Sequence, residues 1–202
     1  MGLFLVGSFK GANLFTKLAF IFLCFAMFFG WISYCTANWG RTFGEDNNDY
    51  YLGYGVWRIG NNEDRNFVRS SLTYVLPLPT IFHADGWLLE WYGAFQAFAT
   101  FGFICLNVGF FLVVLFMFVT PCKSNADLSF WNAINNIFGS ICWLVAIILF
   151  GARFDKKFDT NFSERTLHYS FGLAIITFAL QLAAGILLLL TKRGGGAVQS
   201  SK

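Results

Sequence analysis

Four long stretches of the chain contain no aspartate, glutamate, lysine or arginine. They span residues 18–40, 91–122, 128–152 and 166–191. Each is longer than the roughly 20 residues that a helix needs to cross about 30 Å of membrane hydrocarbon. The pattern therefore predicts four transmembrane helices, joined by loops that carry most of the charge. The predicted spans are residues 16–37, 91–119, 130–150 and 168–190.

The composition indicates that lipid is part of the solvent. Of the 202 residues, 56% are hydrophobic, only 12% are charged and 27 are phenylalanine, and the mean hydropathy is +0.57. A soluble domain of this size has no room to bury that much apolar surface. We predict an all-α membrane protein, with one four-transmembrane-helix bundle over residues 1–202. Outer loops at 38–90 and 151–167 connect the spans, and a tail at 191–202 ends the chain.

An even number of spans places both termini on one side of the membrane. That side carries six lysines and arginines and the other side eight, so the positive-inside rule does not decide the orientation. The only N-glycosylation sequon, Asn161-Phe162-Ser163, lies in the second outer loop. We therefore expect a multi-pass plasma-membrane protein with cytoplasmic termini, and Asn161 is a candidate glycosylation site.

The first outer loop predicts a small extracellular antiparallel β-sheet. β-Prone residues fill positions 50–59 (YYLGYGVWRI) and 70–78 (SSLTYVLPL), and turn residues (GNNED) lie between them. We expect another strand to continue directly out of the first helix through residues 33–39. At roughly 50 residues, the loop is too small for a stable core of its own, so it should fold against the helix ends or a partner.

The loop ends in a segment, DGWLLEW, that predicts a short interfacial helix from Asp85. Trp87 and Trp91 are then expected at the depth of the lipid headgroups, where tryptophan is enriched.

Polar and small residues interrupt the apolar spans. Gln96, Asn107 and Gln181 are among the amide side chains of the spans, and we expect them to hydrogen-bond between helices for about 0.6–2 kcal/mol each. Small residues recur four apart and let neighbouring backbones approach closely, within one bundle or between copies. These pairs are Gly93/Ala97, Ser170/Ala174 and Ala179/Ala183.

No catalytic arrangement is found in the sequence. His83 and His168 are both expected at the outer surface, and His83 with Asp85 supplies too few ligands for a closed metal site. A glycine-rich phosphate loop, a Ser-His-Asp arrangement and a CxxC pair are all missing. We predict that the protein is not an enzyme and has no cofactor, no metal and no nucleic-acid partner. Cys122, at the cytoplasmic end of the second span, is a candidate palmitoylation site or an unmodified interfacial thiol.

Trp39 in ANWG, followed by Gly55-Val56-Trp57, resembles the W…G-L-W signature in the first outer loop of the claudin superfamily. That superfamily includes peripheral myelin protein, the epithelial membrane proteins, lens fibre intrinsic protein, claudins and the stargazin-like receptor subunits. Residues 90–104 look like the start of its second span, and residues 169–193 resemble the fourth span of the peripheral myelin and epithelial membrane branch. The resemblance covers most of the chain and implies a claudin-like bundle with an outer β-sheet.

The chain departs from this family pattern at a pair of first-loop cysteines. The pattern usually has a cysteine about three residues past the second tryptophan and another roughly ten residues later. Gly60 takes the first place here, and no cysteine lies between Cys35 and Cys105. A disulfide closing such a loop contributes roughly 2.5–3 kcal/mol in the chain-entropy model. The sheet must then depend on its own core, for which we expect Trp39, Tyr54 and Trp57.

The resemblance implies two functions that the residues do not separate. One is a non-catalytic tetraspan that organises cell–cell contact or junctional membrane by binding itself in cis or in trans. The alternative is an auxiliary, stargazin-like subunit that modulates the trafficking or gating of a channel or receptor. A paracellular pore formed by the loops of several copies is a third, weaker reading. Candidate contact residues, chosen because aromatics dominate interface hot spots, are Tyr50, Tyr51, Tyr54, Phe67, Phe158 and Phe162.

Overall fold

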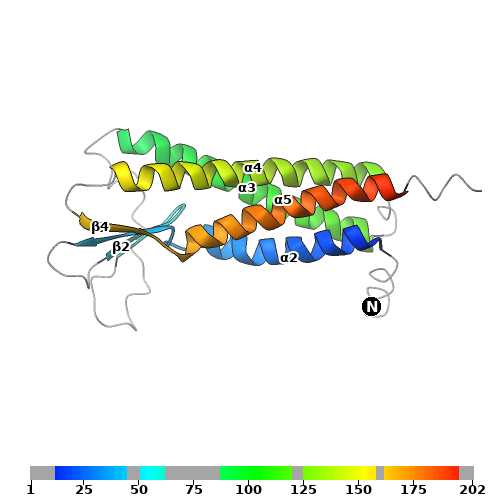
Figure 1. Cartoon of the computed structure of the whole chain (residues 1–202), viewed down its shortest axis with the longest axis horizontal. Helices are drawn as coiled ribbons and strands as arrows, with labels where there is room; N and C mark the ends of the chain where they lie inside the picture. The colour runs from blue at the N-terminus through cyan, green and yellow to red at the C-terminus, as the bar shows by residue number, and fades with distance from the viewer. Residues whose placement is uncertain (1–11, 45–50, 62–86, 120–124, 158–161, 196–202) are drawn as a thin grey trace, which may run out of the picture. The chain divides into compact units, whose positions relative to one another are not determined.

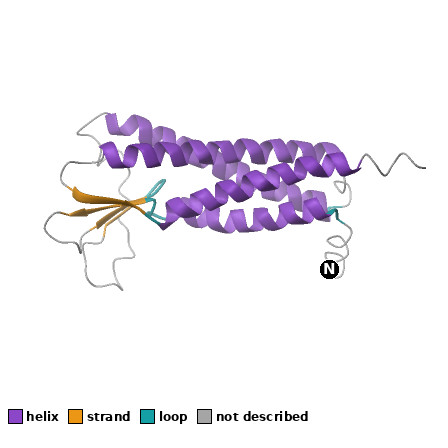
Figure 2. Cartoon of the chain, in the orientation of Figure 1, coloured by secondary structure: helices purple, strands orange, loops and turns teal. Residues whose placement is uncertain are grey.

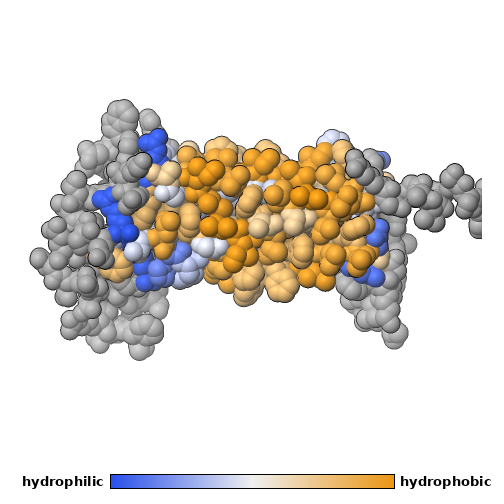
Figure 3. Space-filling view, in the orientation of Figure 1, coloured by the Kyte–Doolittle hydropathy of each residue, from blue (hydrophilic) through white to orange (hydrophobic). Residues whose placement is uncertain are grey.

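A computed structural model describes residues 12–44, 51–61, 87–119, 125–157 and 162–195 of the chain. Four long helices account for most of them (Figures 1 and 2). The helices are α2 (Leu14–Cys35), α3 (Trp87–Phe118), α4 (Ala126–Lys157) and α5 (Tyr169–Gly195). Each contains a segment long and apolar enough to cross a membrane, which confirms the four predicted spans. Hydrophobic residues cover most of the helical surface on the face shown in Figure 3.

Local sequence sets where two of these helices begin. Asn125 precedes α4, and its side-chain oxygen accepts hydrogen bonds from the backbone nitrogens of Asp127 and Leu128, at 3.0 and 3.3 Å. The side-chain oxygen of Asn13 accepts a similar bond from the backbone nitrogen of Phe15 at the start of α2. Both asparagines therefore act as helix N-caps, which satisfy backbone donors that have no partner within the helix.

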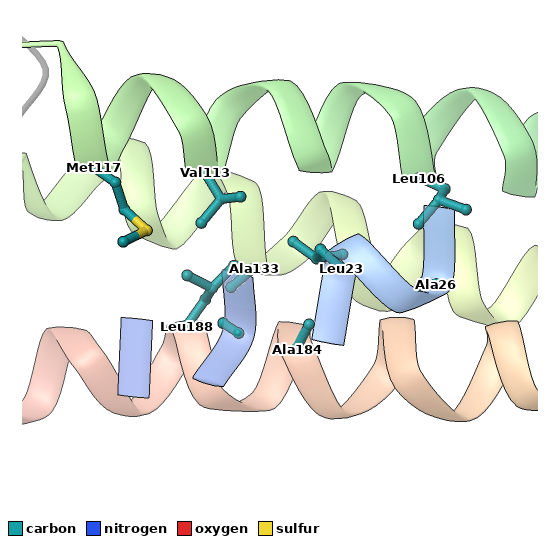
Figure 4. Packing of buried hydrophobic residues seen from close by; sticks show 9 residues of the cluster. Leu23, Ala26, Leu106, Val113, Met117, Ala133, Ala184 and Leu188 are labelled. Atoms are coloured by element: carbon teal, nitrogen blue, oxygen red, sulfur yellow. The ribbon is translucent and has the colours of Figure 1, made fainter. Parts of the chain in front are cut away.

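The chain forms two compact units, and each of the four helices contributes a segment to both. Unit 1 comprises Met1–Phe28, Phe101–Cys142 and Ile176–Lys202, and unit 2 comprises Phe29–Thr100 and Trp143–Ile175. The core of unit 1 is aliphatic (Figure 4). It consists of Ala19, Leu23 and Ala26 of α2, Leu106, Val113 and Met117 of α3, Ala133 of α4, and Ala184 and Leu188 of α5.

Unit 2 contains a four-stranded antiparallel sheet with the strand order β3-β2-β1-β4. The sheet confirms the small antiparallel sheet of the predicted fold class. Its strands are β1 (Gly40–Gly44), β2 (Tyr51–Tyr54), β3 (Ile59–Asn61) and β4 (Phe162–Leu167). The second outer loop thus supplies one strand of the sheet, which the sequence patterns did not predict.

Three local predictions are wrong. Residues 50–59 do not form one strand, because a turn after Tyr54 separates β2 from β3. No strand continues out of the first helix, since α2 ends at Cys35 and β1 begins only at Gly40. Helix α3 does begin at Trp87, but it is continuous with the second span rather than a short separate helix. The strand predicted at 70–78 lies outside the described residues.

Trp91 belongs to the packed interior of unit 2. Its side chain is buried and packs edge-on against Tyr92 and Phe150. The Trp91 ring joins the aromatic core of unit 2 because Phe150 on α4 presents an apolar ring against it. Burial within the chain does not measure depth in a membrane, so the headgroup depth of Trp91 stays a prediction.

Candidate functional site

Trp39 joins the sheet to all four helices of unit 2. Its side chain is 0% exposed, and its indole Nε1 donates a hydrogen bond to the Ser33 carbonyl oxygen of α2 at 2.8 Å. The ring lies edge-on to Phe95 of α3, Phe150 of α4 and Phe171 of α5, with centroid distances of 4.8, 5.4 and 6.0 Å. Such aromatic pairs each contribute about 0.5–1.5 kcal/mol beyond their buried area. The Trp39 side chain is therefore a strong anchor between the sheet and the helices.

The backbone of Trp39 extends this anchor into the chain on both sides. Its nitrogen donates to the Tyr54 carbonyl oxygen at 2.7 Å, and its own carbonyl oxygen accepts from the His168 nitrogen at 2.9 Å. Tyr54, 5% exposed, lies edge-on to the buried ring of Phe154 on α4. The first two strands and the start of α5 therefore meet at one residue.

The turn between β2 and β3 is bound along one side of α3. The backbone nitrogen of Gly55 donates to the Arg58 carbonyl oxygen at 2.8 Å and closes the turn. The hydroxyl of Tyr92 donates to the Gly55 carbonyl oxygen, and one turn of α3 later Gln96 Nε2 donates to the Val56 carbonyl oxygen at 2.8 Å. These bonds satisfy the Gly55 nitrogen and the carbonyl oxygens of Gly55, Val56 and Arg58 at the helix surface.

Trp57 extends this row of hydrogen bonds, which we call the ladder, by one more turn of α3. Its indole Nε1 donates to the Tyr34 hydroxyl oxygen of α2 at 2.8 Å. The Tyr34 hydroxyl is also hydrogen-bonded to Thr100 Oγ1 of α3 at 3.1 Å, and Thr100 donates to the carbonyl oxygen of Gln96. The three α3 residues Tyr92, Gln96 and Thr100 are spaced by four, so they lie on one face of the helix.

Glycine at positions 53 and 55 lets the sheet approach the end of α2 at backbone distance. A Cβ placed on Gly55 would lie 2.7 Å from Ala37 Cα, and closer still to the carbonyl oxygen of Thr36. A Cβ on Gly53 would likewise collide with the carbonyl oxygen of Ala37. The glycine of the G-V-W segment is thus required by packing against a backbone that cannot rotate away.

These contacts hold the sheet without a disulfide. Within the described residues, Cys24, Cys35, Cys105 and Cys142 are all free thiols. The core expected in place of the disulfide contains Trp39 and Tyr54, but the expectation for Trp57 is wrong. Its side chain is 50% exposed, because its indole nitrogen bonds to Tyr34 at the edge of the helices and leaves the ring outside. Val56, next to it, is buried instead.

The structure places the candidate contact residues in different environments. Tyr54 is buried, so its prediction as a contact residue is wrong: its ring fills the space above Phe154. Tyr51 and Phe162 lie in β2 and β4. Five further predicted residues lie outside the part of the chain that the structure describes. They are Tyr50, Phe67 and Phe158, the glycosylation candidate Asn161, and the palmitoylation candidate Cys122.

The amides expected to bridge helices do not do so through their described bonds. Gln96 binds the turn, and Asn107 Nδ2 donates to the carbonyl oxygen of Phe103 within its own helix. Gln181 is 0% exposed, and both polar atoms of its side chain lack a hydrogen-bond partner within the described structure. Helices α4 and α3 are instead bridged by Asn135, whose Nδ2 donates to the Cys105 carbonyl oxygen at 2.8 Å.

The small-residue pairs divide in the same way. Ser170 and Ala174 are buried, and Ser33 Oγ of α2 donates to the carbonyl oxygen of Ser170 at 2.8 Å. Gly93 and Ala97 are exposed on α3, and a Cβ on Gly93 would meet no atom within 4 Å. Of the two packing modes left open by the sequence, packing within the bundle is therefore not seen for Gly93 and Ala97, since no helix among the described residues covers them.

His168 lies at the junction of β4 and α5, and its environment disfavours its charged form. Its Nδ1 is buried without a hydrogen-bond partner in the described structure. Burial, and secondarily the positive charge of Arg41, lower the pKa of the imidazole. In the described part of the chain, no group of three or more histidine, cysteine, aspartate or glutamate residues is placed to hold a metal ion.

Sequence reasoning missed the three hydroxyl groups that carry the ladder: those of Tyr34, Tyr92 and Thr100. A signal was present, because Tyr92, Gln96 and Thr100 form a polar ridge with a spacing of four in an otherwise apolar span. Such a ridge indicates that something polar lies against that face of the helix.

Comparison with known proteins identifies the family of the chain. A search of curated proteins finds no match to the chain. The model of the PMP-22/EMP/MP20/Claudin family, in contrast, matches residues 10–188, which include the first three spans, most of the fourth and the whole sheet. The chain is therefore a four-span membrane protein that belongs to the PMP-22/EMP/MP20/Claudin family.

Proposed function

We propose that this protein organises contacts between membranes as a non-catalytic tetraspan, by binding copies of itself on the same or the neighbouring cell. It resides in the plasma membrane and at cell–cell junctions, with both termini in the cytoplasm and the sheet outside. The membership of the claudin family and the four spans support the membrane part of this proposal. The sheet supports the contact part, through its register.

The register brings together two of the candidate contact residues at one end of the sheet. Tyr51 of β2 pairs with Phe43 of β1, and Phe162 of β4 pairs with Gly44. The other end of β1, at Gly40, pairs with Tyr54 and Leu167 beside the Trp39 anchor. Backbone positions from both outer loops thus converge at the end of the sheet opposite its attachment.

Mixed cell culture tests this proposal. Cells that express the protein with a cytoplasmic fluorescent tag are imaged at contacts where both cells, or only one cell, express it. We expect enrichment only where both do, and we expect the double substitution Tyr51→Ser/Phe162→Ser to abolish it. Leu167→Ser, on β4 at the anchored end, is the matched control and should leave the enrichment intact. Equal fluorescence at both kinds of contact, with normal surface delivery, would refute trans adhesion.

A specific observation favours the second candidate, an auxiliary subunit of a channel or receptor. Gly93 and Ala97 leave a small-residue face of α3 uncovered, and such faces allow close approach of another transmembrane helix. On this reading, the protein stays diffuse until a partner is supplied and then co-purifies with it. Gly93→Leu/Ala97→Leu should abolish that co-purification. Gly172→Leu is the matched control: an added Cβ meets nothing within 4 Å in the described chain there either, but Gly172 lies on α5 and not on the Gly93/Ala97 face, so co-purification should persist.

A further inference from the structure

The turn between β2 and β3 (teal in Figure 2) packs beside the ends of the helices on the side of the sheet. Its residues Gly55, Val56 and Trp57 meet α2 and α3 through Tyr92, Gln96 and Tyr34–Thr100 in turn. From one residue of the turn to the next, the α3 partner therefore advances by four residues, or about 6 Å, further into the apolar span. Trp57 is the residue furthest along.

The length of α3 bounds how deep Trp57 lies. The apolar span Trp91–Phe118 has 28 residues, or about 42 Å, which exceeds the hydrocarbon thickness of about 30 Å by about 12 Å. Thr100 lies nine residues, or about 14 Å, beyond the start of this span at Trp91. Even if all the excess length projects from the Trp91 end, Thr100 lies at the edge of the hydrocarbon, and every other placement or a tilt puts it deeper.

The length of helix α2 gives the same membrane depth for Trp57, independently of α3. Its apolar segment Leu14–Cys35 has 22 residues, or about 33 Å, close to the hydrocarbon thickness. Tyr34 is next to the last residue of that helix and is the direct partner of the Trp57 indole nitrogen. The two helices therefore place Trp57 at the boundary between hydrocarbon and headgroups.

The chemistry of Trp57 and Arg58 suits a lipid at that boundary. The polar end of the Trp57 indole is bound by Tyr34, while 50% of its side chain is exposed. Arg58 follows directly and is also exposed. An exposed arginine beside hydrocarbon reaches towards the headgroup level, where phosphates are the anions its planar fork binds best.

We propose that Trp57 and Arg58 form a binding site for one phospholipid in the leaflet on the sheet side. The indole ring packs against the upper acyl chain, and the guanidinium group pairs with the phosphate. The anchored turn holds the Trp57 indole and the backbone of Arg58 in place before the lipid arrives, so only the Arg58 side chain has to be ordered on binding. The site thereby couples the position of the sheet to the membrane surface.

Fluorine NMR tests the depth of the indole. Full-length protein labelled with 5-fluorotryptophan is placed in phosphatidylcholine nanodiscs, and the resonance that disappears in Trp57→Phe identifies Trp57. We expect its relaxation to be enhanced more by dissolved oxygen, which partitions into hydrocarbon, than by a water-soluble nickel chelate. The buried Trp39, assigned by Trp39→Phe, is the internal control and should respond little to either agent. A larger response of Trp57 to the nickel chelate overturns the proposal, because the ring is then in water.

No response of Trp57 to either agent also overturns it, because a protein surface, such as a second copy, then covers the ring. The phosphate contact is measured separately, as dephasing of guanidino-¹³C-arginine by ³¹P in bilayers. Arg58→Gln should remove about one arginine's share of that signal, and Arg58→Lys should leave the oxygen response of Trp57 unchanged. Unaltered dephasing in Arg58→Gln overturns the phosphate assignment.

Discussion

Gly55→Ala tests whether the signature turn is fixed by its close approach to the end of α2. The added methyl carbon would lie 2.7 Å from Ala37 Cα and 3.0 Å from the carbonyl carbon of Thr36. Carbon atoms in good contact are about 3.5–4.0 Å apart, so the turn has to move by about 1 Å. The obstructing atoms belong to the backbone, which cannot take another rotamer as a side chain can.

The cost follows from what that movement disturbs. Overpacking of a tight site costs about 1–3 kcal/mol. The turn is also held by the Tyr92 and Gln96 hydrogen bonds to its carbonyl oxygens, and weakening them adds about 0.5–1.5 kcal/mol each. We expect a loss of about 2–6 kcal/mol of unfolding free energy. For a chain of this size, this corresponds to a decrease of roughly 4–24 °C in the thermal midpoint.

The assay is thermal unfolding of the purified full-length protein in one detergent at one scan rate, because membrane proteins often unfold irreversibly. Gly93→Ala is the matched control, since nothing lies within 4 Å of its added carbon. Replacing this helical glycine should change the stability by at most about 1 kcal/mol, and towards greater stability. If the Gly55→Ala and Gly93→Ala midpoints coincide, the packing explanation for the signature glycine is wrong.

Three further predictions concern other parts of the chain. Gln181→Met removes two buried polar atoms that have no partner in the described structure, so we expect an equal or higher thermal midpoint; a decrease of several degrees would show that the amide is bonded. The pKa of His168 is lowered from 6.5 in the folded protein, so the unfolded state takes up the proton first as the pH falls. The contribution of His168 to the unfolding free energy should therefore be constant above about pH 6.5 and decrease as the pH falls from there towards the folded pKa. The difference between wild type and His168→Asn in pH-dependent thermal melts isolates this effect, and parallel curves would contradict it. Asn161→Gln should abolish a glycosidase-sensitive gel shift in cells, whereas a wild-type protein without that shift would argue against an outer, modified second loop.

The sequence by itself determined the four spans and the family. Uncharged stretches longer than the hydrocarbon thickness have one stable solution in lipid, because only a helix satisfies all its backbone polar groups internally. The tryptophan and the G-V-W segment were visible as a signature, and so was the missing cysteine pair. Such features depend on composition and spacing along one chain, so they need no knowledge of what lies opposite.

Tertiary structure alone decided which signature residues are buried. Trp39 and Trp57 are similar in the sequence, yet one lies at the centre of four aromatic neighbours and the other is half exposed. The β4 strand was equally invisible, because its charged sequence becomes a strand only through pairing with β1. Gly93 and Gly55 differ for the same reason: one faces open space and the other faces a backbone carbonyl. Whether a residue packs, forms a hydrogen bond or remains exposed depends on partners that are distant in the sequence. Local sequence patterns do not identify those partners.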